Sequence, residues 1–278
     1  MKNSKMENKI LILISSLAFI LIFSACKADM VELKETSSME PPITEESILD
    51  SVEVKVVEEF NPLAEREKTL DEAGINKDVI DISDVEDGRV YQAIKYAKLS
   101  VENDKIQRLL DVVNADLKEG AENFKLDNIE YVREAAKDFD MPDYRYEYDS
   151  TDVVATEMND KYLSLRIFTY ENMMGAHPTY YIEGHIFDVK EGKELKINDL
   201  VKDKETLRNF LYDWCDKNRE SAELFDEYKS TIDDYLAGEY ELQCYMEKDE
   251  IYVVFQIYDI APYAAGAMHI KLPVEILR

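Results

Sequence analysis

The stretch YLSLRIFTYENMMGAHPTYYIEGHIFDVKEGKELKINDL, residues 162–200, decides the fold of this chain. In its first part Leu163, Leu165 and Ile167 alternate with more polar residues. This period of two predicts a strand with one buried face and one exposed face.

A second strand is predicted over residues 179–189, after a Gly-Ala-His-Pro loop at residues 175–178. Gly192 supplies the positive φ that a tight turn requires, and the apolar pattern resumes over residues 194–200. We therefore predict a hairpin that reverses at Gly192.

Blocks of strands and blocks of helices follow one another along the rest of the chain. Asn103 or Asp104 is expected to cap one amphipathic helix, Asp203 to cap a second, and Gly238 to end a third. Strands joined mostly by hairpins, with helices between them, predict an α+β fold with a mainly antiparallel sheet and packed helices. The predicted strands cover residues 90–101, 144–156, 162–170, 179–189, 240–246, 250–258 and 267–272.

Four parts are predicted along the 278 residues, of which 46% are hydrophobic and sufficient for a core. Residues 1–25 form a lipoprotein signal peptide, and residues 26–88 a lipidated cysteine with a flexible acidic tether. A small strand–helix subdomain is expected over residues 89–157. A larger α/β domain is expected over residues 158–278.

The N-terminus indicates export. Lysines precede an apolar run, Ile10–Phe23, which at 14 residues is shorter than the roughly 20 that span a bilayer. Ser-Ala before Cys26 resembles the lipobox of bacterial lipoproteins, so Cys26 is expected to carry a lipid after cleavage. An uncleaved signal anchor and a plain secretory peptide remain alternatives, and all three place the rest of the chain outside the cytoplasm. We expect it on the outer face of the cell membrane, anchored by lipid alone.

Charge and composition restrict the partners. The chain has a net charge of −27, and the chain without residues 1–25, which carry +2, has −29. Such a surface repels nucleic acid and anionic headgroups, and it attracts basic partners. The Glu-, Ser-, Thr- and Pro-rich composition near residues 36–45 predicts the flexible tether.

Two cysteines remain beyond Cys26. Cys215 is expected on the apolar face of a helix, and Cys244 on the apolar face of a strand. A disulfide outside the cell and two buried free thiols are both compatible with this pattern.

A family resemblance rests on three segments, namely Met174–Pro178 leading to Ile186–Leu195, then Asn198–Leu200, and Tyr258–Gly266. Together they resemble the extracellular domain shared by RsiV-type lysozyme-sensing anti-sigma factors and PdaC-type peptidoglycan deacetylases. The predicted strand at Tyr96–Ser100 and the helix after it resemble the smaller domain that precedes this one in those proteins. The resemblance covers roughly residues 89–278.

The chain also departs from these relatives. The anti-sigma factors carry a cytoplasmic segment of tens of residues, whereas only residues 1–9 precede the apolar run here. The deacetylases carry a catalytic domain after the shared one, whereas this sequence ends at Arg278. Met174 stands where the relatives tend to have a second glycine. The resemblance therefore implies the shared outer module alone, on a lipid anchor.

No catalytic, metal or cofactor site is predicted. His177, His185 and His269 are the three histidines, and the spacing of eight between the first two is no recognised zinc pattern. No nucleophile, base and orienting group can be named together, so we expect no enzyme activity.

Two turn segments are the candidates for recognition, because aromatic and histidine side chains on turns are common in interfaces. The alternative is structural, with the glycines and the proline shaping turns and Tyr263 filling the core. The candidate binding residues are Gly175, His177, Pro178, Tyr180, Tyr181, Tyr258 and Tyr263.

The expected function is that of a surface-anchored binding or sensing module. The resemblance suggests a basic extracellular protein such as lysozyme as the partner. A peptidoglycan glycan binder or accessory envelope protein, with tyrosines stacking on sugars, is the alternative.

Overall fold

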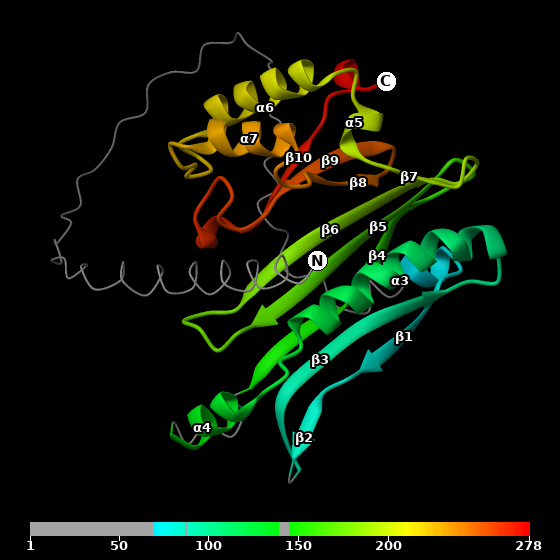
Figure 1. Cartoon of the computed structure of the whole chain (residues 1–278). Helices are drawn as coiled ribbons and strands as arrows, with labels where there is room; N and C mark the ends of the chain where they lie inside the picture. Colours follow the sequence, from blue (N-terminus) through cyan, green and yellow to red (C-terminus); the bar gives the residue numbers. More distant parts are fainter. Residues whose placement is uncertain (1–68, 87, 139–144) are drawn as a thin grey trace, which may run out of the picture. The chain divides into compact units, whose positions relative to one another are not determined.

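A seven-stranded sheet forms the centre of the structure, a computed structural model that describes residues 69–86, 88–138 and 145–278 (Figure 1). Its strands are β1 (Asn76–Asp81), β2 (Asp84–Glu86), β3 (Arg89–Ser100), β4 (Tyr146–Met158), β5 (Tyr162–Asn172), β6 (Thr179–Asp188) and β7 (Lys193–Leu195). The order across the sheet is β1-β3-β4-β5-β6-β7, with β2 paired to β3.

All pairs in this sheet are antiparallel except β3 and β4, which run parallel. Parallel neighbours need a long crossover connection. Here α3 (Asp104–Phe124) and α4 (Glu130–Asp138) lie in that connection. The predicted α+β class with a mainly antiparallel sheet is confirmed.

The hairpin predicted around Gly192 is present. β6 pairs with β7 from Ile186 with Leu195 to Asp188 with Lys193. On its other side β6 pairs with β5, from Tyr162 with Asp188 to Glu171 with Thr179. Gly192 has a φ of 70° in the turn between β6 and β7. The alternation of buried and exposed residues explains why both strands were visible in the sequence.

Helix α3 covers one face of the sheet (Figure 1). Asn103 caps it, because the Asn103 side chain accepts hydrogen bonds from the backbone nitrogens of Lys105 and Ile106. Its apolar stripe packs on the sheet in a buried cluster formed by Ile106, Leu109, Leu110, Val113, Leu117, Val153, Leu163, Leu165, Ile167 and Phe187, among others.

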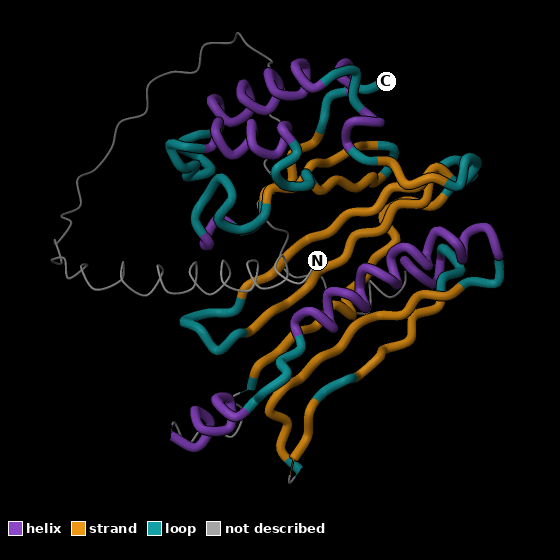
Figure 2. Tube along the Cα trace, viewed as in Figure 1, coloured by secondary structure: helices purple, strands orange, loops and turns teal. Residues whose placement is uncertain are grey.

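A second sheet of three strands follows in the order β10-β9-β8. Its strands are β8 (Gln243–Glu247), β9 (Glu250–Phe255) and β10 (Met268–Lys271), and α5 (Ile197–Leu200), α6 (Lys204–Asn218), α7 (Tyr228–Ala237), η1 (Tyr263–Ala265) and η2 (Val274–Ile276) complete this part. Asp203 caps α6, and Gly238 ends α7 with a φ of 91°. Figure 2 shows α3 lying along the first sheet, and β5, β6 and the second sheet between α3 and the pair α6 and α7.

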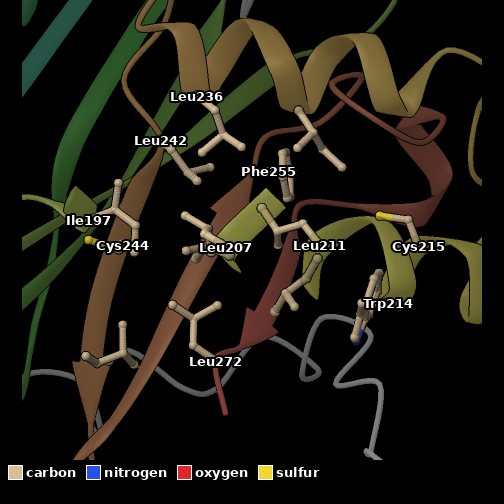
Figure 3. Close-up of a cluster of buried hydrophobic side chains, with 14 of the residues drawn as sticks. Ile197, Leu207, Leu211, Trp214, Cys215, Leu236, Leu242, Cys244, Phe255 and Leu272 are labelled. Carbon is tan, nitrogen blue, oxygen red and sulfur yellow. The ribbon is translucent and has the colours of Figure 1, made fainter. Parts of the chain in front are cut away.

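A large apolar cluster fills the space between the second sheet and α6 and α7 (Figure 3). Cys215 and Cys244 lie at opposite ends of the labelled residues, and both are buried free thiols. Of the two alternatives that the sequence left open, the structure has the free thiols.

The two sheets meet where β8 crosses β6. The backbone oxygen of Cys244 occupies the space above Gly184 that a Cβ atom would need. The Gln256 side chain donates to the backbone oxygen of Ile182 at 2.8 Å and accepts from its nitrogen at 2.9 Å, and Gln243 accepts from the nitrogen of Gly184 at 3.1 Å. Since β7 pairs with β6 only over residues 186–188, these glutamines satisfy backbone groups that would otherwise form an open edge.

The structured region begins earlier than predicted. The expected tether over residues 26–88 overlaps β1 and β2, which pair with β3 and extend its sheet. The sequence Asn-Lys-Asp-Val-Ile-Asp of β1 hid this edge strand, because it shows no alternation of apolar and polar residues and its side chains are exposed or half-buried. The expected boundary at residues 157–158 lies inside the β4–β5 hairpin.

The signal peptide, Cys26 and most of the tether lie outside the described residues. Within the part of the chain that the structure describes, every helix is too short or too polar to cross a membrane.

Candidate functional site

The segment after β9 places two tyrosines at the surface. Tyr258 has a φ of 68°, which turns the chain, and its side chain is 40% exposed. The Asp259 carboxylate fixes this turn, because it accepts from the backbone nitrogen of Gln256 at 2.5 Å and from the Tyr235 hydroxyl at 2.6 Å. Tyr263 begins the short helix η1 beyond it.

His177, in the β5–β6 loop, lies against both tyrosines. Its ring centroid is 4.2 Å from that of Tyr263 and 6.2 Å from that of Tyr258. Its Nε2 atom is 3.1 Å from the Tyr258 hydroxyl oxygen, and its Nδ1 atom is 2.9 Å from the backbone oxygen of Pro178. We call His177, Tyr258 and Tyr263 the aromatic surface.

These contacts indicate which nitrogen of His177 carries the proton. A carbonyl oxygen only accepts, so Nδ1 must donate to Pro178. In the neutral ring Nε2 is then an acceptor, and the Tyr258 hydroxyl donates to it. The histidine thus orients the Tyr258 hydroxyl while its ring packs on Tyr263.

Tyr180 supports this surface from below. Its hydroxyl accepts a hydrogen bond from the backbone nitrogen of Ala267 at 3.2 Å, and its ring stacks on Phe168 with centroids 5.1 Å apart. Its edge faces Tyr263, with the ring centroids 6.3 Å apart. Tyr180 is half-buried in the cluster between the two sheets, so it positions Tyr263.

Tyr181, predicted for the same site, lies on the other face of β6. Neighbouring residues of a strand point to opposite faces, and Tyr181 pairs across the strands with Thr169 on the side that α3 covers. Its side chain is 40% exposed there. The structure therefore separates Tyr181 from Tyr180.

Gly175 and Pro178 lie in the loop that carries His177. A Cβ atom at Gly175 would meet only the backbone oxygen of His177, at 3.9 Å, so this position has room for a side chain. Met174 instead adopts the left-handed conformation, with a φ of 62°. The loop therefore turns at Met174 and not at Gly175.

The three histidines lie in three different surroundings. His185 is buried and its Nδ1 atom contacts a Glu194 oxygen at 2.9 Å, whereas His269 contacts the Tyr245 hydroxyl at 3.1 Å. Within residues 69–86, 88–138 and 145–278 no group of three His, Cys, Asp or Glu residues is placed to hold a metal ion.

The two cysteines are poor nucleophiles. Burial raises the pKa of the Cys215 thiol to about 12, and burial raises that of Cys244 to about 12 as well. Both therefore stay protonated at neutral pH.

Sequence reasoning missed two carboxylates on the face that α3 covers, Glu171 and Glu183. Burial, followed by the charge of Glu183, raises the pKa of Glu171 to about 7. Burial also raises the pKa of Glu183, against the lowering effect of His185. The alternation of the strands could have revealed them. Glu171 lies an even number of residues from buried Ile167 on β5, and Glu183 pairs with Ile167 across the strands, so both glutamates lie on the same face as Ile167.

Two family models match the chain. Residues 85–180 match the family described as "Deacetylase PdaC", and residues 198–275 match the "Protein of unknown function (DUF3298)" family. These are the two domains found in RsiV-like proteins, which supports the resemblance at the level of domains. His177 lies in the first matched region, and Tyr258 and Tyr263 lie in the second.

Two solved structures are similar to the chain, each over 73% of this chain and 94% of its own. One is a DUF3298 family member from Bacteroides fragilis, with 19% identity and a TM-score of 0.49. The other is a DUF3298 family protein from Pseudomonas aeruginosa PAO1, with 15% identity and a TM-score of 0.48. No curated protein matches the chain.

Proposed function

We propose that this protein is a binding module on the outer face of the cell membrane, anchored through a lipid on Cys26, and that its aromatic surface contacts the ligand. One observation carries the proposal. His177 of the first matched region and Tyr258 and Tyr263 of the second converge, with a 3.1 Å contact and a 4.2 Å ring separation. Exposed aromatic side chains of this kind are enriched among residues that dominate binding energy.

The proposed ligand is a basic extracellular protein of the lysozyme type. The net charge of −27 supports this choice, because opposite charges raise the rate of encounter. The resemblance to lysozyme-sensing ectodomains suggests the same class. The proposal assigns the chain no catalytic role, so release of acetate or reducing ends from peptidoglycan would contradict it.

Calorimetric titration of the full chain with lysozyme tests this proposal. Binding is expected at low salt, weaker at physiological salt, and at least about tenfold weaker in Tyr263→Ala, which removes a ring from the centre of the surface. Tyr240→Ala is the matched control, since Tyr240 is also exposed but lies apart from the aromatic surface. Absence of heat at low salt, or equal losses in both variants, rejects lysozyme at this surface.

A peptidoglycan glycan is the second candidate, because tyrosine rings at a surface stack on sugars. This reading predicts retention of the full chain on purified peptidoglycan that survives high salt and is lost in Tyr263→Ala. Salt-sensitive retention would instead indicate charge alone.

The anchor has its own test. Metabolic labelling with a radioactive fatty acid is expected to mark the wild-type chain and not Cys26→Ala, with the label in the membrane fraction. Labelling that persists in the variant, or a chain recovered from the cytosol with Met1 intact, would reject the anchor.

A further inference from the structure

A polar site lies on the face of β5 and β6 opposite the aromatic surface. Thr169 and Glu171 follow Ile167 at every second residue of β5, and Tyr181 and Glu183 lie beside them on β6. Ile167 packs in the cluster beneath α3, so the residues on the same face of the strands as Ile167 also face α3. The two glutamates flank the Thr169–Tyr181 pair diagonally.

Helix α3 passes close beside this site at Gly120. A Cβ atom at Gly120 would lie 2.5 Å from the Tyr148 hydroxyl oxygen. Tyr148 is the cross-strand partner of Glu171. The glycine therefore lets α3 close onto buried Tyr148, whereas Tyr181 is 40% exposed.

Two buried hydroxyl groups lie beside Tyr148. Ser150 is 0% and Thr169 is 3% exposed, and within the described residues neither side-chain oxygen has a partner at full hydrogen-bond geometry. Burial raises the pKa of Tyr148, and the Ser150 and Thr169 hydroxyls lower it by interacting with the phenolic oxygen as donors. Each hydroxyl oxygen keeps its own lone pairs as acceptors. Buried polar groups are nearly always satisfied by protein, water or a ligand, so this place has an unused capacity to hydrogen-bond.

The carboxylates are also uncompensated. No lysine or arginine of the described residues forms an ion pair with Glu171 or Glu183. The titratable groups that face the pair are Asp116 on α3, Tyr148 on β4, Tyr181 and His185 on β6, and Glu241 before β8. His185 lowers the pKa of Glu183, whereas Asp116 and Glu241 raise it. Half-buried carboxylates surrounded mainly by other acidic groups are costly for stability and typical of functional sites.

We propose that Glu171, Glu183 and Thr169 bind an alkylammonium group, with Tyr181 at the edge of the site. An ammonium brings three donors and no acceptor, which matches carboxylate and hydroxyl oxygens. A tyrosine ring adds a favourable contact with a cation. This site does not depend on the proposed function, since it lies on the opposite face of the sheet.

Calorimetric titration of the full chain at physiological salt tests the site with two probes. Putrescine represents a free amine, and Nα-acetyl-lysine methylamide represents a lysine side chain. Saturable binding of either probe supports the site, and the tighter probe identifies the source. A wild-type chain that shows no saturable heat with either probe overturns the proposal and leaves water as the occupant.

Variants separate the site from the general negative charge. Glu171→Gln and Glu183→Gln are each expected to weaken binding at least tenfold. Glu220→Gln is the control, because Glu220 is an exposed glutamate in the turn after α6, and it is expected to leave binding unchanged. Equal affinity in all three variants overturns the proposal. If a glutamine variant melts below the assay temperature, Tyr181→Ala serves instead, and it too must weaken binding.

The pH dependence of amine binding is a further test that needs only the wild-type chain. Affinity is expected to fall between about pH 8 and pH 5.5, because the amine must compete with a proton on Glu171. An affinity that is constant over this range contradicts the assignment of Glu171 as a ligand.

Discussion

Gly184 of β6 lies directly beneath the backbone carbonyl of Cys244 in β8, at the point where the two sheets cross. A Cβ atom at this position would overlap the carbonyl oxygen and carbon of Cys244. A backbone carbonyl in a paired strand cannot rotate away from the clash as the end of a flexible side chain can. The packing of the second sheet on the first therefore requires glycine here.

Gly184→Ala is expected to lower the free energy of unfolding by about 3 kcal/mol, because the added methyl group forces β6 and β8 apart. Urea denaturation of the full chain measures the change. Gly175→Ala is the control, and it should change stability by less than about 0.5 kcal/mol because its position is open. Similar values for both variants would contradict the close approach.

Gln256→Ala is expected to destabilise the protein by about 2 kcal/mol. The substitution leaves both the nitrogen and the oxygen of Ile182 without their partner, in a place screened by the second sheet. Gln243→Ala removes one bond, to Gly184, and should cost about half as much. A larger loss in Gln243→Ala would argue against this account of the β6 edge.

The β8–β9 turn is open to improvement. Lys248 and Asp249 have φ values of 53° and 62°, which is the geometry of a type I′ turn and favours Asn-Gly. The double variant Lys248→Asn, Asp249→Gly is expected to raise the free energy of unfolding by about 1 kcal/mol, since both residues then adopt positive φ without strain. A thermal melt checks this, and a lower melting temperature would reject the turn assignment.

Stability is expected to depend on pH through Glu171. Its pKa is raised from 4.5 to about 7 by burial and by Glu183, so between these values the folded protein holds a proton that the unfolded chain has released. The free energy of unfolding contributed by this group therefore falls as the pH rises from 4.5 to 7, and it is constant above.

Glu171→Gln removes this dependence. Above pH 7 the variant is expected to be more stable than the wild type by about 1 to 2 kcal/mol, a figure reduced for partial exposure, and near pH 4.5 the two should agree. Urea denaturation across the range measures it, with Glu220→Gln as the control. A glutamate that lowers stability but binds an amine would be kept for function.

Local features of the fold could be predicted from the sequence because they depend on neighbouring residues. The cap at Asn103 and the positive φ at Gly192 require only a few adjacent side chains and backbone groups. The alternation in β5 predicts that one face of the strand is buried, but it does not predict which element covers that face. Pairings between distant segments carry no such signal, so the parallel β3–β4 contact and the edge strand β1 were not predicted.

The candidate site divides in the same way. The sequence selected His177, Tyr258 and Tyr263 as turn residues, and the structure brings them together. The structure excludes Tyr181 from that group, because neighbouring residues of a strand point to opposite faces of the sheet and Tyr180 already points to this one. It adds Glu171 and Glu183 on the far side, whose burial depends on where α3 lies.

The sequence by itself determined the α+β class, the central hairpin, the starts of α3 and α6 and the end of α7, since periodicity and capping are properties of contiguous residues. Only the tertiary structure decided that β8 crosses β6 at Gly184, that His177 meets Tyr258 and that two half-buried glutamates face α3. Those relations join residues far apart in the chain, and they arise from how apolar faces pack in three dimensions.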